Sequence, residues 1–137
     1  MQYRATIERE SARGPYNVSF ADCPGCLTFG KTAAAALENA HEALEGWLEA
    51  HLISGTVPPA PKAKRGTPID VRWRLAIVVQ IRQRRAELGL TQAQLAKRAK
   101  LTQQQIAKLE NPDENPTLAT LEKVTAALGA RFEMVAA

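Results

Sequence analysis

The sequence of 137 residues lacks long hydrophobic runs, because no segment approaches the roughly 18 consecutive apolar residues of a membrane-spanning helix. The N-terminal residues 1–4 are not followed by the apolar core of a signal peptide. From these absences we expect a soluble cytoplasmic protein. A chain of this length can hold one domain or two small ones.

Cysteine and histidine are scarce, at two residues each. Cys23 and Cys26 enclose Pro24-Gly25, which is typical of a type II turn with glycine at positive φ. His41 and His51 are ten positions apart on one expected helix, too far to share a metal with the cysteines. The sequence therefore favours a structural turn and predicts no metal and no cofactor. A redox pair or a metal site at the cysteines is the open alternative.

Charge is divided unevenly along the chain. Residues 1–61 contain 4 Lys and Arg against 7 Asp and Glu, whereas residues 62–137 contain 14 against 7. A basic half beside an acidic half predicts a polyanionic partner for the C-terminal side only.

The N-terminal third has the pattern of a small α+β domain. Short alternating segments at 3–9, 16–20 and 26–29 predict three strands, separated by Gly-Pro and Pro-Gly turns. Thr32 is expected to cap a helix that runs to about residue 52. Its apolar face has a period near 3.6 and contains Leu37, Ala40, Leu44, Trp47, Leu48 and Leu52. We therefore place a first domain at residues 1–56.

Residues 57–68 read as a linker. They contain four prolines and the basic cluster Lys62, Lys64 and Arg65. These cations are interpreted as solvated linker charges, with contact to phosphate as the alternative.

A second domain is expected at residues 69–137. Strict alternation at 69–75 predicts a strand, and helical spacing then continues to about residue 88. Two short helices and a helix from Thr117 to Leu128 follow, and residues 131–135 alternate again. We hypothesise that the two strand-like segments pair, within one chain or between two, and build a dimer interface.

Residues 91–110 carry the strongest functional signal. They form two Thr-x-x-Gln helix starts, at Thr91 and Thr102, joined by a short turn. The apolar side chains of the two helices are spaced to face each other and a core, and the rest are Gln, Lys and Arg. This layout predicts a helix-turn-helix that reads DNA, with an ordinary helical hairpin as the alternative. Lys100 stands at the turn, where glycine is usual and another residue costs on the order of 1 kcal/mol.

The second of these helices is expected to lie in the major groove. Thr102 caps it, so its first turn contains Gln103, Gln104 and Gln105. Glutamine can bond bidentately to adenine, and Lys108, one turn beyond Gln104, can reach guanine or phosphate.

Further candidates lie on either side of that helix. Gln92 opens the preceding helix and is expected to hold a phosphate, and Asn111 is a weaker phosphate candidate. Lys97 and Arg98 are basic but fit a solvated helix face equally well.

This segment resembles the helix-turn-helix of the lambdoid phage repressors, the XRE type. The resemblance implies that Gln103, Gln104 and Lys108 face bases and that Gln92 and Asn111 hold phosphates. It also implies a structural ion pair between Arg85 and Glu110. Lys108 departs from the glutamine of the most similar repressors, so a target sequence does not carry over.

The N-terminal domain resembles the HicB antitoxins of type II toxin–antitoxin systems, over about residues 3–53. Their signature is aromatic-x-Asp-x-Pro-Gly-Cys-x-Thr-x-Gly, followed by Asn-Ala-x-Glu-Ala-Leu. The matching positions are Asp22, Pro24, Gly25, Cys26, Thr28, Gly30, Thr32, Asn39, Ala40 and Glu42.

The HicB resemblance implies a partial RNase H-like sheet and helix that binds a HicA-type mRNA interferase, a small basic toxin. Nuclease chemistry is not expected, because the strands offer only Glu8, Glu10 and Asp22 as metal-binding carboxylates. The residues that contact the toxin are unknown from the sequence.

The sequence as a whole predicts a non-enzymatic antitoxin that neutralises its toxin, represses its own operon and forms a homodimer or a higher oligomer through its C-terminal domain. The alternative is a stand-alone helix-turn-helix regulator whose N-terminal domain senses a ligand or another protein.

Overall fold

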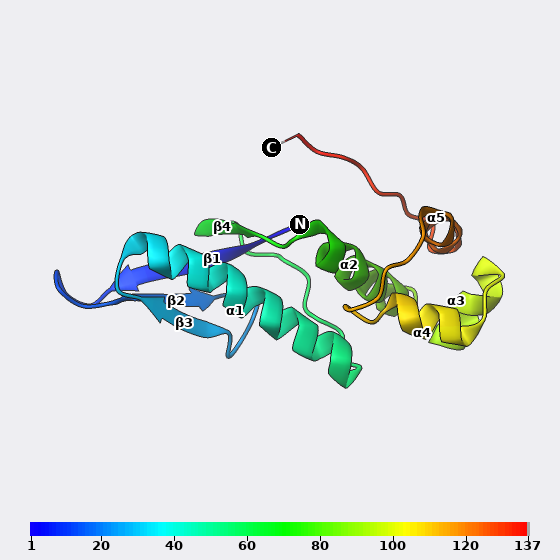
Figure 1. Cartoon of the computed structure of the whole chain (residues 1–137), viewed down its shortest axis with the longest axis horizontal. Coiled ribbons are helices and arrows are strands. Elements are labelled where there is room, and N and C mark those ends of the chain that lie inside the picture. Colours follow the sequence, from blue (N-terminus) through cyan, green and yellow to red (C-terminus); the bar gives the residue numbers. More distant parts are fainter. Residues whose placement is uncertain (137) are drawn as a thin grey trace. The chain divides into compact units, whose positions relative to one another are not determined.

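The N-terminal part of the chain forms a four-stranded antiparallel sheet of β1 (Gln2–Arg9), β2 (Tyr16–Phe20), β3 (Leu27–Gly30) and β4 (Thr67–Asp70), in the order β3-β2-β1-β4 (Figure 1). The computed structural model describes residues 1–136. It divides into two compact units, Met1–Ala76 and Ile77–Ala137, which we call the first and second units and describe separately. The expected α+β fold class is confirmed.

One helix, α1 (Ala33–Ser54), packs against the sheet. Thr32 caps it as predicted, because its side chain accepts a hydrogen bond from the backbone N–H of Ala35. The buried residues follow a spacing of four and are Ala36, Ala40, Leu44, Leu48 and Leu52. Leu37, which we expected on this face, is 39% exposed. It lies about 100° around the helix from Ala36 and so falls outside a stripe that drifts only about 40° per four residues.

The sheet buries alternate residues beneath α1. Ala5 pairs with Phe20 and Tyr3 with Ile69, and all four side chains are buried. Asn39 of α1 donates from its side-chain amide to the carbonyl of Phe29, 2.8 Å away, which ties the helix to the edge strand β3. β3 and β4 are thus the edge strands of a sheet whose core lies on the face covered by α1.

β4 lies at the edge of this sheet, not at the start of the second unit. Gln2 to Ala5 pair antiparallel with Thr67 to Asp70. The predicted strand at residues 69–75 is therefore shorter and earlier, and helix α2 (Trp73–Glu87) begins inside the predicted range. The alternating pattern led to a strand prediction that is too long, because Val71 and Leu75 are both buried at a spacing of four, which also fits the start of a helix.

Residues 57–66, which we call the strap, form no helix or strand but are attached to the first unit. Pro58 is buried, and the Tyr3 hydroxyl donates to the carbonyl of Pro59 at 2.7 Å. Gly66 has φ of +113°, and a side chain there would lie 2.6 Å from the carbonyl oxygen of Ala5. The expected linker therefore has the irregular backbone of a linker but fixed contacts with the sheet.

Asp22 anchors the middle of the strap. Its Oδ2 accepts hydrogen bonds from the backbone N–H groups of Lys62 and Ala63, each at 2.8 Å. A carboxylate that accepts hydrogen bonds from two backbone N–H groups satisfies donors that have no partner in a neighbouring strand.

The second unit is a helical cluster. It contains most of α2, followed by α3 (Gln92–Ala99), α4 (Gln103–Leu109) and α5 (Leu118–Ala127). Its core contains Ile81, Leu95, Ala96, Ala99, Ile106, Leu109, Leu121, Val124 and Leu128.

The predicted terminal strand is not formed. Residues 131–136 have no regular structure and are exposed, and β4 pairs with β1. Pairing within the chain between the two segments that bracket the helices is therefore contradicted.

We expect Asp22→Asn to loosen the strap. The substitution weakens two bonds to a charged acceptor, each worth about 1.5 kcal/mol or more. Amide hydrogen exchange of Lys62 and Ala63 should accelerate roughly tenfold. Asp70→Asn is the matched control, because within residues 1–136 the side chain of this exposed residue has no hydrogen bond or ion pair. Unchanged exchange in Asp22→Asn would show that other contacts hold the strap.

Candidate nucleic-acid interface

Two consecutive capping boxes build the pair α3 and α4. Thr91 accepts from the N–H of Gln94, whose side-chain oxygen accepts from the N–H of Thr91. Thr102 and Gln105 repeat the arrangement at the start of α4. Each box satisfies donors that a short helix leaves open, so two helices of about two turns become stable.

The turn between these helices runs through Lys100. Its φ of 57° and ψ of 42° are left-handed, and it is the one described non-glycine residue with positive φ. Its N–H and that of Leu101 donate back to the last turn of α3, at the carbonyls of Lys97 and Ala96. The chain thus forms the predicted turn with lysine in place of glycine, at a cost on the order of 1 kcal/mol.

Three predicted base-reading residues lie exposed on α4. Gln103 and Gln104 occupy its first turn, and Lys108 follows Gln104 by four residues, on the same side of the helix. Within residues 1–136 their side chains make no hydrogen bond or ion pair. They are therefore available to an external partner.

Gln105 differs from its two neighbours. Its Oε1 accepts from the N–H of Thr102 at 2.8 Å and faces the Thr102 hydroxyl at 3.3 Å. The capping box therefore occupies its acceptor and leaves only its amide N–H groups for another partner.

The two predicted phosphate contacts lie at helix boundaries. Gln92 is the first residue of α3 and is half-buried. Asn111 follows α4, and its Oδ1 accepts from the N–H of Asp113 at 3.0 Å, which leaves its amide N–H groups as donors.

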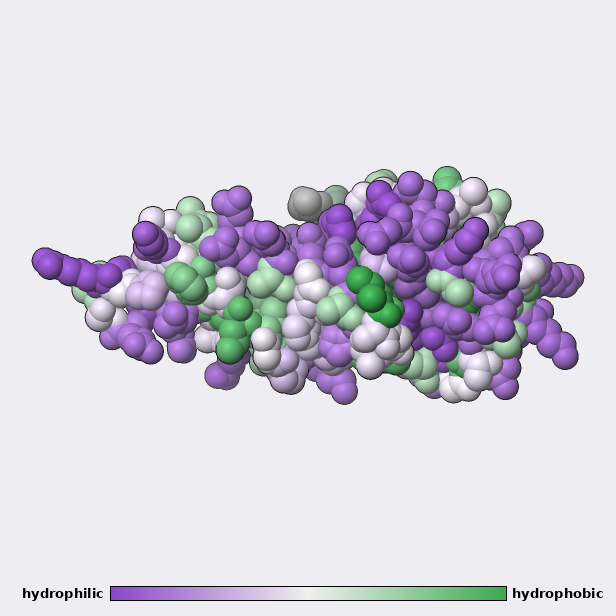
Figure 2. Space-filling model, turned by 60° about the horizontal axis from the view of Figure 1, so that its bottom comes forward, coloured by the Kyte–Doolittle hydropathy of each residue, from purple (hydrophilic) through white to green (hydrophobic). Residues whose placement is uncertain are grey.

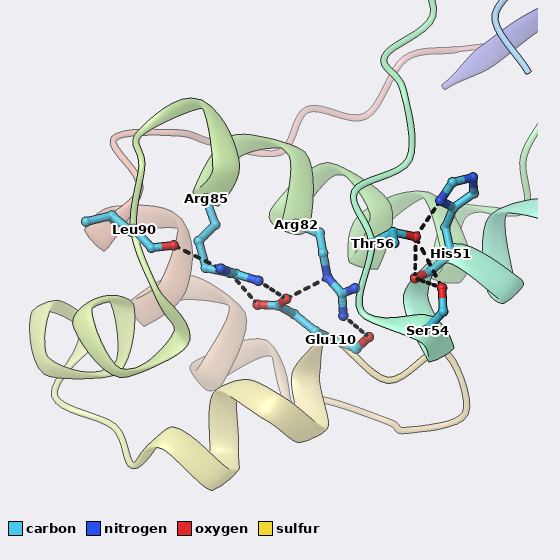
Figure 3. A network of polar contacts seen from close by, with 7 residues as sticks. All are labelled: His51, Ser54, Thr56, Arg82, Arg85, Leu90 and Glu110. Atoms are coloured by element: carbon cyan, nitrogen blue, oxygen red, sulfur yellow. Dashed lines mark hydrogen bonds and ion pairs between the residues drawn. The ribbon is translucent and has the colours of Figure 1, made fainter.

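A buried carboxylate fixes the end of α4. Both guanidinium groups of Figure 3 converge on Glu110, whose side chain is 0% exposed. Arg85 donates to its two oxygens at 2.8 and 2.7 Å, and Arg82 donates through Nε at 2.7 Å. Arg85 also donates to the carbonyl of Leu90 at 2.9 Å.

This network connects α2 to the recognition helix. The pair of Arg85 and Glu110 was expected from the resemblance to the lambdoid repressors, whereas Arg82 was not. Its position three residues before Arg85 places it on the same face of α2, which was the available signal. Two arginines satisfy both carboxylate oxygens, so the buried charge is paired and hydrogen-bonded as a buried charge requires.

The surface of the helix pair is positive. Glu110 is the single carboxylate between residues 91 and 110, and the exposed charges there are Lys97, Arg98, Lys100 and Lys108. On the face drawn in Figure 2, hydrophilic residues dominate and hydrophobic ones form small separate patches. This combination suits a phosphate backbone better than an apolar partner.

The cysteines of the first unit lie in a tight turn. The N–H of Cys26 donates to the carbonyl of Cys23 at 3.0 Å, and Gly25 has φ of +85°, as a type II turn requires. Burial raises the pKa of Cys23 to about 12 and that of Cys26 to about 11. Both remain protonated thiols near neutral pH, which disfavours nucleophilic chemistry at this pair.

The histidines have structural partners. His41 hydrogen-bonds the carbonyl of Asp70 at 3.1 Å and thereby connects α1 to β4. His51 hydrogen-bonds Thr56 at 2.6 Å, in the cluster at the end of α1 that Figure 3 also shows. No group of three or more His, Cys, Asp or Glu in the described range is arranged to hold a metal ion, and no helix there could cross a bilayer.

These features define a helix-turn-helix DNA-binding protein with a separate α+β unit at its N-terminus. Residues 81–134 match the helix-turn-helix family. Residues 3–82 match the HicB-like antitoxins of bacterial toxin–antitoxin systems. The chain belongs to the HicB family of antitoxins, in the branch that carries a C-terminal helix-turn-helix.

Individual relatives agree over nearly the whole length. Antitoxin HicB 1 of Photorhabdus laumondii is 31% identical over 129 residues, which cover 94% of this chain and 83% of the relative. Antitoxin HicB of Escherichia coli K12 is 28% identical over 137 residues, which cover 98% and 99% of the two chains. The match spans both units, so it does not rest on the helix-turn-helix alone.

We expect Glu110→Gln to destabilise the second unit by about 3–5 kcal/mol, because it leaves one buried and one half-buried guanidinium group without a counter-charge. Arg85→Met should cost less, since Arg82 keeps the carboxylate paired. Urea unfolding followed by helical circular dichroism measures both. The control is Glu87→Gln at the exposed pair with Arg84, where a change below about 1 kcal/mol is expected. Equal effects at Glu87 and Glu110 would contradict a structural role for the network.

Proposed function

We propose that this antitoxin binds and neutralises a HicA-type mRNA interferase through its first unit and represses its own operon through its second. The observation that supports DNA reading is the exposed row of Gln103, Gln104 and Lys108 at the start of a rigidly anchored α4. The proposal of a HicA-type partner rests on membership of the HicB family.

At the operator, α4 enters the major groove. Gln103 and Gln104 bond base edges, and Lys108 contacts guanine or phosphate. Gln92 and Asn111 hold backbone phosphates, and Thr102 and Gln105 act mainly by fixing the first turn of α4. Glu110 with its two arginines holds the helix in the orientation that base reading requires.

Repression of this kind usually involves two copies on a two-fold symmetric site. We propose that the second unit forms a homodimer. Phe132, Met134 and Val135 support this, because they are exposed apolar side chains in a C-terminal segment that makes no strand within its own chain. Exposed apolar side chains close together in sequence favour burial against a partner.

For the toxin, we propose the face of the sheet opposite α1. Leu27 and Phe29 of β3 are 70% and 59% exposed there and border a shallow hollow. Glu8 is the ionisable residue that lines it, among Thr6, Asn17 and Ser19. Apolar anchors beside an acidic group suit a small basic partner. The meander of β1 to β3 followed by α1 supports a partial RNase H-like origin of this unit.

We expect Gln104→Ala and Gln92→Ala to change DNA binding in different ways. Loss of a bidentate base contact should reduce discrimination between operator and scrambled duplex by about 1–3 kcal/mol, whereas loss of a phosphate contact should weaken both duplexes alike. Fluorescence anisotropy at one fixed salt concentration measures both. Equal losses on the two duplexes for Gln104→Ala would refute its assignment to a base.

Co-expression with the adjacent toxin gene tests neutralisation. The wild-type chain should rescue growth and co-purify with the toxin. Leu27→Ser with Phe29→Ser should lose both without losing operator binding, because these side chains do not support the core of either unit. The matched control is Leu118→Ser, at an exposed leucine of the second unit. Growth rescue by the double variant would contradict the proposal that the toxin binds this face of the sheet.

A further inference from the structure

The strap carries three cations that the functions above do not use. Lys62, Lys64 and Arg65 are exposed, and within residues 1–136 their side chains have no hydrogen bond or ion pair. Two arginines of the first unit are engaged instead: Arg72 pairs with Glu45 and Glu49, and Arg9 stacks on Tyr16. These three cations of the strap are therefore available to an external partner.

These cations sit on a backbone that is already ordered. Asp22 holds the amides of Lys62 and Ala63, and Arg4 donates to the carbonyl of Gly66 at 3.2 Å. β4 begins immediately afterwards and is paired with β1. A flexible linker would lose backbone entropy when its charges bind, whereas the strap has lost it on folding.

The cluster also stands out from the charge of its surroundings. Residues 1–76 contain nine Lys and Arg and eight Asp and Glu, and one third of the positive charge lies in four consecutive positions, 62–65. A concentrated run of cations on an otherwise acidic unit favours a polyanion over a basic protein as its partner. The toxin, as a basic protein, does not fit this surface.

We propose that the strap is a second DNA contact, in which Lys62, Lys64 and Arg65 bind backbone phosphates of the duplex that α4 reads. This inference rests on the proposed operator binding. Eleven residues separate Arg65 from Ile77, so a duplex bound by the second unit is held at high effective concentration near the strap. Phosphate contacts carry no sequence information, so the strap adds affinity and salt dependence without changing the preferred bases.

The test compares two variants of the full-length chain with equal loss of charge. Lys64→Gln with Arg65→Gln removes a lysine and an arginine from the strap. Arg13→Gln with Lys31→Gln removes an arginine and a lysine from exposed positions elsewhere in the first unit. Both leave the backbone bonds to Asp22 in place, and exchange of the Lys62 and Ala63 amides verifies this.

The probes are a duplex that covers the promoter region directly upstream of the chain's own gene and a scrambled duplex of equal length. With about 0.9 counterions released per phosphate, the negative slope of log affinity against log salt should be less steep by about 1.8 in the strap variant. Its disadvantage relative to wild type should then shrink roughly tenfold between about 50 and 200 mM salt. The control variant should stay close to the wild-type slope, and the ratio between the two duplexes should not change for either.

The outcomes separate this inference from the function on which it depends. A wild-type chain that does not prefer the promoter duplex overturns operator binding itself. A wild-type chain that prefers it, with equal slopes for the two variants, overturns the strap contact alone.

Discussion

The buried carboxylate of Glu110 is the constraint on which the DNA-binding unit depends. A charge that is fully removed from water costs several kcal/mol unless it is paired, and here Arg82 and Arg85 pair it from adjacent turns of α2. Because Glu110 directly follows α4, this pairing sets where the reading helix ends. The side chains at its start, Gln103 and Gln104, are thereby positioned without making contacts of their own. The buried anchor thus lies just after the C-terminal end of this seven-residue helix, and the exposed glutamines lie at its start.

Features that depend on neighbouring residues were predictable from the sequence. The caps at Thr32, Thr91, Thr102 and Thr117, the turn at Lys100 and the three N-terminal strands follow from residue spacing, and the structure has them. The pair of Arg85 with Glu110 was available only through resemblance. Arg82 was missed because its spacing of three from Arg85 shows that the two share a face of the helix but does not identify the carboxylate that they meet. The Thr-x-x-Gln spacing already indicated Gln105 as the capping partner of Thr102, and the structure confirms that capping box.

The errors lie where long-range contacts override a local pattern. Four prolines and a basic cluster have the composition of a linker, yet Asp22, forty residues earlier, holds the segment to the sheet. Alternation from Ile69 to Leu75 has the period of a strand, yet only its beginning finds a partner, because the antiparallel register reaches the first residue of β1, Gln2, at Asp70. The same reason leaves residues 131–136 without a strand: alternation alone supplies no partner. Composition limits the structures that a segment can form, and its long-range contacts determine which of them it adopts.

The attachment of the strap has a consequence for how such proteins diversify. The helix-turn-helix unit matches a family of its own, over residues 81–134, and can be treated as a module. A junction placed at the prolines would strip β4 from the sheet and remove the partner of Asp22, and the recipient would inherit an incomplete N-terminal unit. A junction after Arg72, whose side chain already pairs with Glu45 and Glu49 of α1, keeps the sheet whole. The suitable junction for recombination or for engineered chimeras therefore lies at the start of α2, C-terminal to the proline-rich segment.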